Sequence, residues 1–200
     1  MSAETRMITG RKAKTYDLRG PLWNSIKAKH LNLVSPKSGQ RVLDVGCGTG
    51  KSLYLLSQMC DPSVKLHGVE PSGDMLDQAK GKLRKRAKLH KGLAQKLPYP
   101  DDSFNWVIST QVMHHLPLPE KKKMLQEMHR VLKPGGVMVI SDWGQPTNLP
   151  GKFLAFLWRN HAYVEQNQQI LNVPTMQKTG FTSVQEDLQF DIVHHIHAKK

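Results

Sequence analysis

The sequence has little cysteine and no long apolar run. Its 200 residues include two cysteines, Cys47 and Cys60, which are too few for a disulfide framework or a zinc cluster. We therefore expect reduced thiols and no bound metal. No stretch approaches the roughly 20 apolar residues that a membrane-spanning helix requires, and the N-terminus lacks the apolar core of a secretory signal. These absences predict a soluble protein located in the cytoplasm.

Acidic residues are also few. Asp and Glu number 16 against 29 Lys and Arg, and the formal net charge is +13. The excess lies in two basic segments, 6–37 and 82–91. Charge of this kind attracts anionic partners over long distances, so the sequence predicts RNA or an acidic membrane as a partner. A solvated surface that keeps the protein soluble explains the charge equally well.

The chain has the length of one domain with a single hydrophobic core. From residue 40 onward, short runs rich in Val and Ile alternate with segments of helical periodicity, which is typical of a parallel sheet covered by helices. Strands are predicted at 41–45, 64–70, 87–91, 104–110 and 136–143, and helices at 50–59, 72–85 and 119–132. KPGG at 133–136 is expected to end the last helix with a turn. Two closely spaced strands, 181–190 and 192–198, are expected to pair antiparallel.

These elements predict an α/β fold. Its seven-stranded, mostly parallel sheet should carry helices on both faces and end in an antiparallel C-terminal pair. We divide the single domain into an N-terminal helical cap over the cleft at 1–39, a core at 40–143, and an acceptor-side segment with the C-terminal hairpin at 144–200. The cap contains an amphipathic segment at 21–34, and a further apolar helix is predicted at 153–164.

A glycine-rich loop follows the first predicted strand, with the sequence DVGCGTGKS at 44–52. A phosphate-binding loop of the form G-x-x-x-x-G-K-[ST] would need glycine where the chain has Val45. The dinucleotide pattern G-x-G-x-x-G also fails by one residue, because the glycines are Gly46, Gly48 and Gly50. What remains is a strand that ends in an acid, followed by G-x-G-x-G at the start of a helix.

Five motifs in order resemble a known family. VLDVGCGTG, an acid at the end of the next strand in GVEPSGDML, LPYPDDSFNWVIST, MHHL and LKPGG all lie between residues 40 and 143. Together they resemble the class I S-adenosylmethionine-dependent methyltransferases, and more narrowly the subgroup with ubiquinone and menaquinone biosynthesis methyltransferases and many small-molecule methyltransferases. The resemblance implies a Rossmann-like fold, S-adenosylmethionine as the cofactor, and methyl transfer to carbon, oxygen or nitrogen of a small-molecule acceptor.

The chemistry of the glycine loop suits that cofactor. S-adenosylmethionine carries no phosphate, so the loop must instead bring its backbone close to the ligand, which glycine permits. Glu70 stands 20 residues after Gly50, where a carboxylate accepts hydrogen bonds from both ribose hydroxyls. The resemblance implies that Asp44 holds the loop backbone, or a water near the ligand's amine. The predicted cofactor-binding residues are Tyr16, Asp44, Gly46, Cys47, Gly48, Gly50, Glu70, Pro71, Met75, Leu93, Ala94, Ser109 and Gln111.

One position departs from the family pattern. Related sequences usually read GDAEKLP where this chain reads GLAQKLP, so Leu93 replaces the acid that accepts from the adenine amino group. Losing such a hydrogen bond costs about 1.5–3 kcal/mol of affinity unless Gln95 or a backbone carbonyl substitutes. We expect adenine recognition to rest on apolar contact with Leu93 and Met75 and on the Ala94 backbone N–H.

Residues able to act on an acceptor follow the fourth and fifth predicted strands. Methyl transfer mainly requires alignment of the acceptor with the methyl group, and a base is needed only where the acceptor loses a proton. Of His114 and His115, we expect His114 to face the cofactor cleft, although a structural role as a cap is equally consistent with the sequence. Asp142 ends a strand where open parallel sheets place functional groups. Tyr16 and Trp143 are candidates to line the pocket and attract the sulfonium, or to belong to the core.

Two other functions remain open from the sequence. Methyl transfer to RNA, or to a lipid or quinone at an anionic membrane, fits the basic segment 6–37. A non-catalytic S-adenosylmethionine-binding protein fits Leu93 and the short region between the fifth and sixth predicted strands. The segment 82–91 flanks the third predicted strand, which belongs at a sheet edge away from the cleft, so it is expected to serve solubility or docking.

Overall fold

The computed structural model describes residues 8–10, 13, 15–18, 20–144, 146, 148–149 and 165–200. The predicted helix at 153–164 lies outside these residues, as do Arg11, Lys12 and Lys14 of the basic N-terminal segment. In the part of the chain that is described, no helix is long and apolar enough to cross a membrane.

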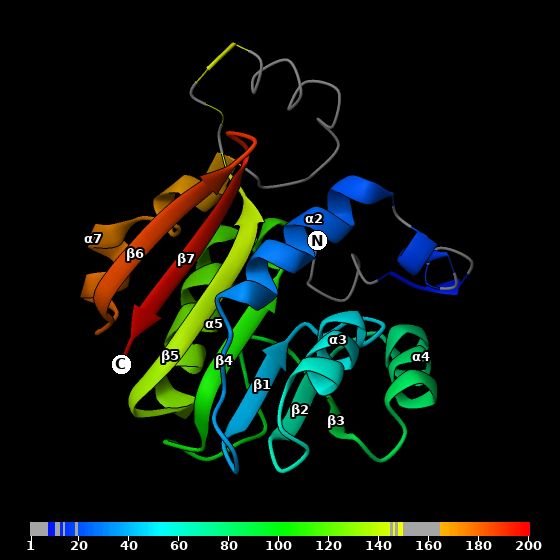
Figure 1. The fold of residues 1–200 in the computed structure, drawn as a ribbon. Helices are drawn as coiled ribbons and strands as arrows, with labels where there is room; N and C mark the ends of the chain where they lie inside the picture. The colour runs from blue at the N-terminus through cyan, green and yellow to red at the C-terminus, as the bar shows by residue number, and fades with distance from the viewer. Residues whose placement is uncertain are drawn as a thin grey trace.

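Within the described residues, seven strands form one sheet in the order β3-β2-β1-β4-β5-β7-β6 (Figure 1). The strands are β1 Arg41–Val45, β2 Lys65–Glu70, β3 Ala87–Lys91, β4 Phe104–Thr110, β5 Leu132–Trp143, β6 Thr182–Gln189 and β7 Val193–Lys199. The first five run parallel, and β7 pairs antiparallel with both β5 and β6. The predicted Rossmann-like, mostly parallel sheet with an antiparallel C-terminal pair is confirmed, and β3 lies at an edge as expected.

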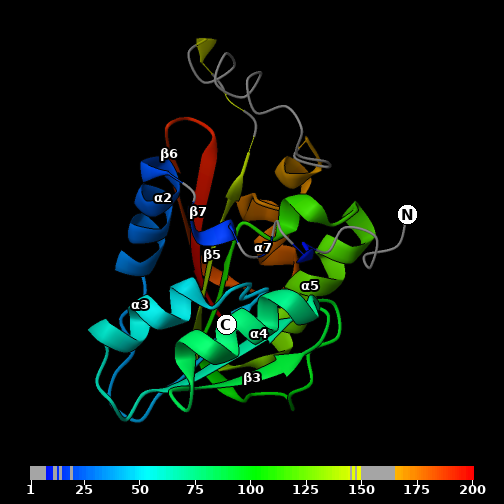
Figure 2. The ribbon, with the colours of Figure 1, turned by 90° about the vertical axis from the view of Figure 1, so that its right-hand side faces the viewer.

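Helices cover both faces of the sheet. They are α2 Pro21–Asn32, α3 Lys51–Met59, α4 Gly73–Leu83, α5 Leu118–Val131 and α7 Val173–Lys178, with short 3-10 helices η2 Tyr16–Leu18, η3 Met113–His115 and η4 Glu165–Gln169. Figure 2 shows α2 and α3 on one side of the sheet and α5 and α7 on the other. Because side chains alternate along a strand, Leu43 of β1 packs in the α5 core and Val42 in the α3 core.

The expected KPGG turn is wrong. Helix α5 ends at Val131, and β5 begins at Leu132 without a separate turn. The register between β4 and β5 shifts between the pairs Phe104–Leu132 and Trp106–Val137, so the KPGG residues form an irregularity inside a longer strand. Gly135 has a φ of +72° there, a conformation that glycine adopts at low cost in such bulges.

Buried polar contacts attach α2 to the sheet. His30 Nδ1 lies 2.7 Å from Ser141 Oγ in β5, and Ser141 Oγ lies 2.7 Å from His195 Nδ1 in β7. Burial lowers the pKa of His30 to about 3 and that of His195 to about 4, in both cases with help from neighbouring cations. The imidazoles are therefore neutral near pH 7, and they fix the rotation of α2 about its axis. Trp23 and Trp143 add an edge-to-face contact with ring centroids 5.5 Å apart.

Gly50 offers a test of the packing between the glycine loop and α4. Its φ is +74°, and a Cβ there would lie 2.8 Å from Leu83 Cδ1. Gly50→Ala should therefore lower the free energy of unfolding by about 1–3 kcal/mol, through backbone strain and overpacking. Gly81→Ala in α4 is the matched control, because its Cβ would meet no atom within 4 Å, and it should stabilise by about 0.5–1 kcal/mol. Urea denaturation measures both, and equal stability of the two variants would contradict the packing described.

Candidate active site

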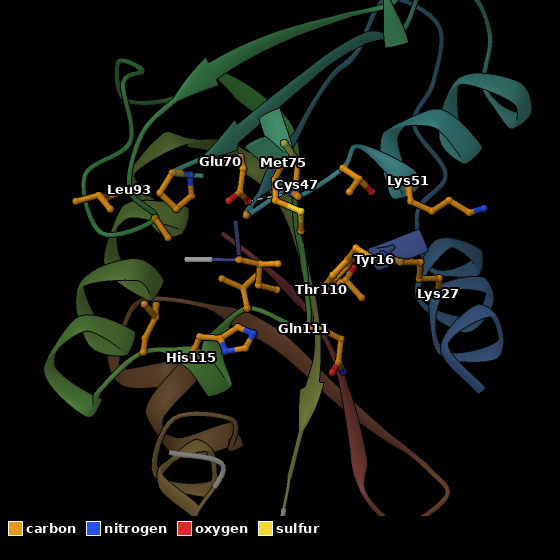
Figure 3. A pocket seen from close by; sticks show the side chains of 18 of the residues that line it. Tyr16, Lys27, Cys47, Lys51, Glu70, Met75, Leu93, Thr110, Gln111 and His115 are labelled. Carbon is orange, nitrogen blue, oxygen red and sulfur yellow. Dashed lines mark hydrogen bonds between the residues drawn. The ribbon is translucent and has the colours of Figure 1, made fainter. Parts of the chain in front are cut away.

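A cavity opens at the carboxyl ends of β1, β2 and β4, beside η2 and α2 (Figure 3). The strand order reverses between β1 and β4, and open parallel sheets bind ligands at this switch point. The cavity holds about 920 Å³ of empty space, including its open mouth. Its lining is Ile8, Tyr16, Lys27, Gly46, Cys47, Gly48, Thr49, Lys51, Glu70, Pro71, Met75, Leu93, Ala94, Gln95, Thr110, Gln111, Val112, His115 and Leu116.

The glycine loop forms one wall. The N–H groups of Gly46 and Cys47 both donate to the Val69 carbonyl, at 2.8 and 3.0 Å, which ties the loop to β2. A Cβ on Gly46 would lie 2.5 Å from Val112 Cγ2, and φ of Gly46 is +73°. Glycine at this position therefore lets the segment after β4 approach the loop. The backbone N–H of Gly48 donates a hydrogen bond to the side chain of Glu70, which lines the cavity.

The Glu70 carboxylate is held at the end of β2. Its Oε2 accepts from Gly48 N at 3.0 Å and its Oε1 accepts from Ser72 N at 2.9 Å. The side chain lines the cavity, although the residue is only 9% exposed. Burial raises the pKa of Glu70 above its ordinary value, against the two backbone hydrogen bonds, which lower it. Each oxygen uses one lone pair in these bonds, so the carboxylate keeps capacity to accept from a ligand.

Polar side-chain atoms without a partner lie at the end of β4. Thr110 Oγ1 and both amide atoms of Gln111 are buried and have no hydrogen-bond partner among the described residues. Both residues line the cavity, and Gln111 has a φ of +60°. Buried polar atoms are normally paired, because an unsatisfied one costs about 1–3 kcal/mol. This corner of the cavity is therefore suited to a polar ligand.

The buried side chain of Asp142 holds the segment after β4 in place by hydrogen bonds. Its Oδ2 accepts from Val112 N at 2.8 Å and Met113 N at 2.6 Å, and its Oδ1 lies 2.7 Å from His114 Nδ1. Burial alone would raise the pKa of Asp142, but the interaction with His114 and the hydrogen bonds outweigh it and lower that pKa. The carboxylate is therefore ionised near pH 7, and it fixes the turn that contains η3.

The expectation that His114 faces the cleft is wrong. His114 is 1% exposed and its ring is turned to Asp142, whereas His115 lines the cavity. The two rings lie against each other with centroids 3.9 Å apart. Met113–His115 form a single turn of 3-10 helix, so the neighbouring side chains of His114 and His115 point in different directions. His114 is the buried one because its ring forms a hydrogen bond with Asp142. Trp143, a candidate to line the pocket, instead packs on Trp23.

Most of the predicted cofactor-binding residues lie together around the cavity. Ten of them line it: Tyr16, Gly46, Cys47, Gly48, Glu70, Pro71, Met75, Leu93, Ala94 and Gln111. Three do not. Gly50 packs on α4, Ser109 Oγ donates to the Val45 carbonyl at 2.9 Å, and Asp44 is buried below the loop at 2% exposure. Asp142 also lies behind the cavity wall, where it acts on the backbone.

Sequence reasoning missed other lining residues. Thr49, Thr110 and Val112 adjoin predicted positions, so a wider window around each motif would have included them. Lys27 had no local signal, since its place depends on how α2 docks; its Nζ donates to Ser52 Oγ at 3.2 Å. Another basic residue of the same segment, Lys29, pairs with Asp187 at 2.7 Å.

Tyr16 is held over the glycine loop by its neighbour. Asp17 accepts from Thr49 Oγ1 at 2.7 Å and pairs with Lys82 of α4. Burial opposes ionisation of Asp17, but Lys82 and Thr49 prevail and lower its pKa. Lys82 Nζ also donates to the Thr49 carbonyl at 2.9 Å. Lys82, from the basic segment 82–91, thus links α4 to η2 and to the glycine loop.

Apolar side chains form the end of the cavity that the sequence assigned to adenine. Leu93 and Met75 both line it, and the Ala94 backbone lies between Leu93 and Gln95. The Gln95 amide nitrogen donates to Glu120 Oε2 at 2.9 Å, which orients the Gln95 side chain. Among the described residues, no group of three His, Cys, Asp or Glu side chains could hold a metal ion.

The chain is similar in sequence to known methyltransferases. A family model described as a methyltransferase domain matches residues 42–136. Demethylmenaquinone methyltransferase from Geobacillus stearothermophilus is 34% identical over 129 residues, covering 62% of this chain and 53% of that protein. The chain thus spans about half the length of the first curated relatives that it matches.

Two solved structures share the fold. The match to a SAM dependent methyltransferase from Aquifex aeolicus has a TM-score of 0.71 at 24% identity, and it covers 96% of this chain and 99% of that chain. Phosphoethanolamine N-methyltransferase 2 from Haemonchus contortus, in complex with S-adenosyl-L-methionine, has a TM-score of 0.71 at 21% identity, with 89% and 52% covered. These likenesses show that the chain shares the fold of these two proteins.

Asp44 should make the free energy of unfolding depend on pH. Burial raises the pKa of Asp44 from 3.8 to about 7, with Lys27 opposing and Glu70 adding to the shift. Between those values the folded protein keeps a proton that the unfolded chain has lost, so this group's contribution to stability falls as pH rises. Relative to wild type, Asp44→Asn should gain about 2–3 kcal/mol of unfolding free energy between about pH 5 and pH 8.

Urea denaturation of both proteins at the two pH values measures that gain. Asp77→Asn, at the exposed end of an ion pair with Lys80, serves as the control and should show a constant difference from wild type. A constant difference for Asp44→Asn as well would show that Asp44 is ionised throughout.

Proposed function

We propose that the chain is a class I S-adenosylmethionine-dependent methyltransferase that transfers the methyl group of S-adenosylmethionine to a small-molecule acceptor. The observation that carries this proposal is the Glu70 carboxylate, fixed at the end of β2 by Gly48 N and Ser72 N and directed into the cavity. A carboxylate in this place accepts from ribose hydroxyls and disfavours a phosphorylated ribose.

The residues present fit that cofactor. Glu70 would hold the ribose, and Gly48 allows the backbone to approach it. Leu93, Met75 and Ala94 offer an apolar face to adenine. The unpartnered atoms of Thr110 and Gln111 supply donors and acceptors for the polar end of the ligand. When bound, S-adenosylmethionine supplies a methyl group on a positively charged sulfur, which is activated toward displacement by a nucleophile.

The protein's own contribution is alignment and, where the acceptor must lose a proton, a base. His115 lines the cavity and is the imidazole placed to take that proton. His114 and Asp142, predicted as catalytic, would act as positioning residues, since Asp142 holds His114 and the backbone of the turn from behind. Enclosure of acceptor and methyl group together supplies orientation, worth about 7–11 kcal/mol in favourable cases.

A quinone-like acceptor is the most specific proposal that the relatives support. The matched proteins of Geobacillus and Listeria are named demethylmenaquinone methyltransferases. Methylation at a ring carbon of a reduced quinone requires loss of a proton from an acidic centre, which is the case where a base contributes. Lys27 and Lys51 at the same cavity would favour an acceptor that carries negative charge as it reacts.

Substitution of Glu70 tests the cofactor site. Glu70→Gln keeps the shape but removes the charge, so affinity for S-adenosylhomocysteine should fall by about 10- to 100-fold. Asp77→Asn in α4 removes an exposed carboxylate and should leave that affinity unchanged. Calorimetric titration measures all three proteins. Absence of binding by the wild type at millimolar ligand would refute the proposed function.

Substitution of His115 tests the base. With a demethylated, reduced naphthoquinone as acceptor, His115→Ala should lower kcat by about 100-fold or more. S-adenosylhomocysteine affinity should change little. His90→Ala on the edge strand β3 is the control and should keep wild-type kcat. Full activity of His115→Ala would exclude it as the base, and no turnover by wild type with cofactor bound would favour a non-catalytic binding protein.

A further inference from the structure

A second groove is lined by residues at the amino ends of β1, β2 and β3, at the other end of these strands from the cavity. Because the three strands are parallel, their first residues meet at one edge. Strand β1 starts with Arg41 and β2 with Lys65, while Lys85 and Arg86 precede β3 and Lys88 is its second residue. All five basic side chains line the groove.

The strand register places these cations next to one another. Arg41 is the direct neighbour of Lys65, and His67 is the direct neighbour of Lys88. Like charges on adjacent strands are destabilising, and among the described residues no carboxylate lines the groove. The acid nearest in sequence, Asp61, lies outside the lining, and its Oδ1 accepts from Ser63 N at 2.8 Å. Asp61 interacts electrostatically with Arg86, so it offsets part of this charge, but the groove keeps five cations against that one neighbouring carboxylate.

Buried polar atoms of the groove also lack partners. His67 is 5% exposed, and its Nδ1 has no hydrogen-bond partner among the described residues. Arg86 Nη1 donates to the Val64 carbonyl at 2.8 Å, but its Nη2 is buried and unpaired within the same part of the structure. Burial is the main cause that lowers the pKa of His67 to about 4, and Arg41 and Lys88 add to the shift.

The chemistry of the groove favours a phosphate backbone over a lipid surface. The large apolar side chains that are exposed in the described residues are Tyr54, Met59, Leu149, Leu188 and Phe190, and none lines the groove. Binding to a membrane surface by insertion requires such side chains on a projecting face. An open groove with several cations instead suits a flexible chain of phosphates, since proteins that bind single strands follow the backbone with a positively charged groove.

From this placement we propose that the groove at the amino ends of β1, β2 and β3 binds the phosphate backbone of a single-stranded polynucleotide. Lys65, Lys85 and Lys88 are exposed and supply long-range attraction, while Arg41 and Arg86 are partly buried and fix the position of a phosphate. Arg41 is itself held over the Phe104 ring, 4.9 Å from its centroid. The site lies at the other end of the strands from the methyltransferase cavity, so it is a partner site outside the reaction centre.

The test uses the full chain and a fluorescent oligouridylate of roughly 12 nucleotides, a length typical of single-strand sites. Anisotropy is measured between about 50 and 200 mM salt. The variant Lys65→Gln, Lys85→Gln, Lys88→Gln should bind at least tenfold more weakly, and the slope of log affinity against log salt should fall in magnitude by about 2. The matched control replaces three exposed lysines elsewhere, Lys122, Lys123 and Lys178, by Gln and should bind as wild type does.

Several results would overturn the proposal. They are no binding of the strand by wild type, an equal loss in both triple variants, or groove-dependent binding of phosphatidylserine vesicles or inorganic phosphate without binding of the strand. S-adenosylhomocysteine affinity of the groove variant should equal that of wild type, which shows that the variant is folded. That titration measures binding at the cavity, which lies at the other end of the strands. A failure of the methyltransferase proposal can therefore be distinguished from a failure of the groove proposal.

Discussion

The hydrogen bonds of the buried Asp142 carboxylate are the contacts on which the cavity depends. They hold Val112 and Met113 by their backbone N–H groups and His114 by its ring. Asn167 Nδ2 approaches the same carboxylate at 3.3 Å and donates to the Trp143 carbonyl at 2.6 Å. A single ionised group at the end of β5 thus joins the turn after β4 to the segment after β5. Removing it would leave these buried donors unpaired, at a cost of about 1–3 kcal/mol each.

The wall of the cavity follows from the hydrogen bonds of Asp142. With the turn fixed, Val112 packs against the glycine loop so closely that Gly46 has no room for a Cβ. Gln111 and His115, on either side of Val112, then line the cavity. From the other side, Glu70 fixes Gly48 through a backbone hydrogen bond. Two buried carboxylates therefore set the positions of the two loops that border the cavity.

Charge is divided between the two ends of the sheet. At the carboxyl ends, Asp44 and Glu70 are buried and both have raised pKa values; Glu70 lines the cavity together with Lys27 and Lys51, and Asp44 lies below the glycine loop. At the amino ends, basic side chains gather in a groove, and no carboxylate of the described residues belongs to its lining. Both features arise from parallel pairing, which brings the same end of every strand to the same edge. Part of the positive net charge of the chain is thus concentrated at the amino ends of these strands.

Sequence reasoning succeeded where function is carried by local backbone pattern. The glycine loop and the acid 20 residues beyond it specify their own positions, because a strand, a turn and a helix start leave few alternatives. It failed where tertiary contacts decide orientation. Whether His114 or His115 faces the cavity depends on Asp142, which lies 28 residues from His114. Lys27 enters the cavity lining because His30, Ser141 and His195 fix the rotation of α2, and no local pattern encodes that contact.

The most direct test of the central claim is a crystal structure of the chain with S-adenosylhomocysteine. We expect the ligand in the cavity between the glycine loop and the turn after β4, with both ribose hydroxyls donating to Glu70 and adenine against Leu93. Thr110 and Gln111 should acquire partners on the ligand. A ligand bound elsewhere, or one that occupies this cavity without contacting Glu70, would refute this assignment of the site.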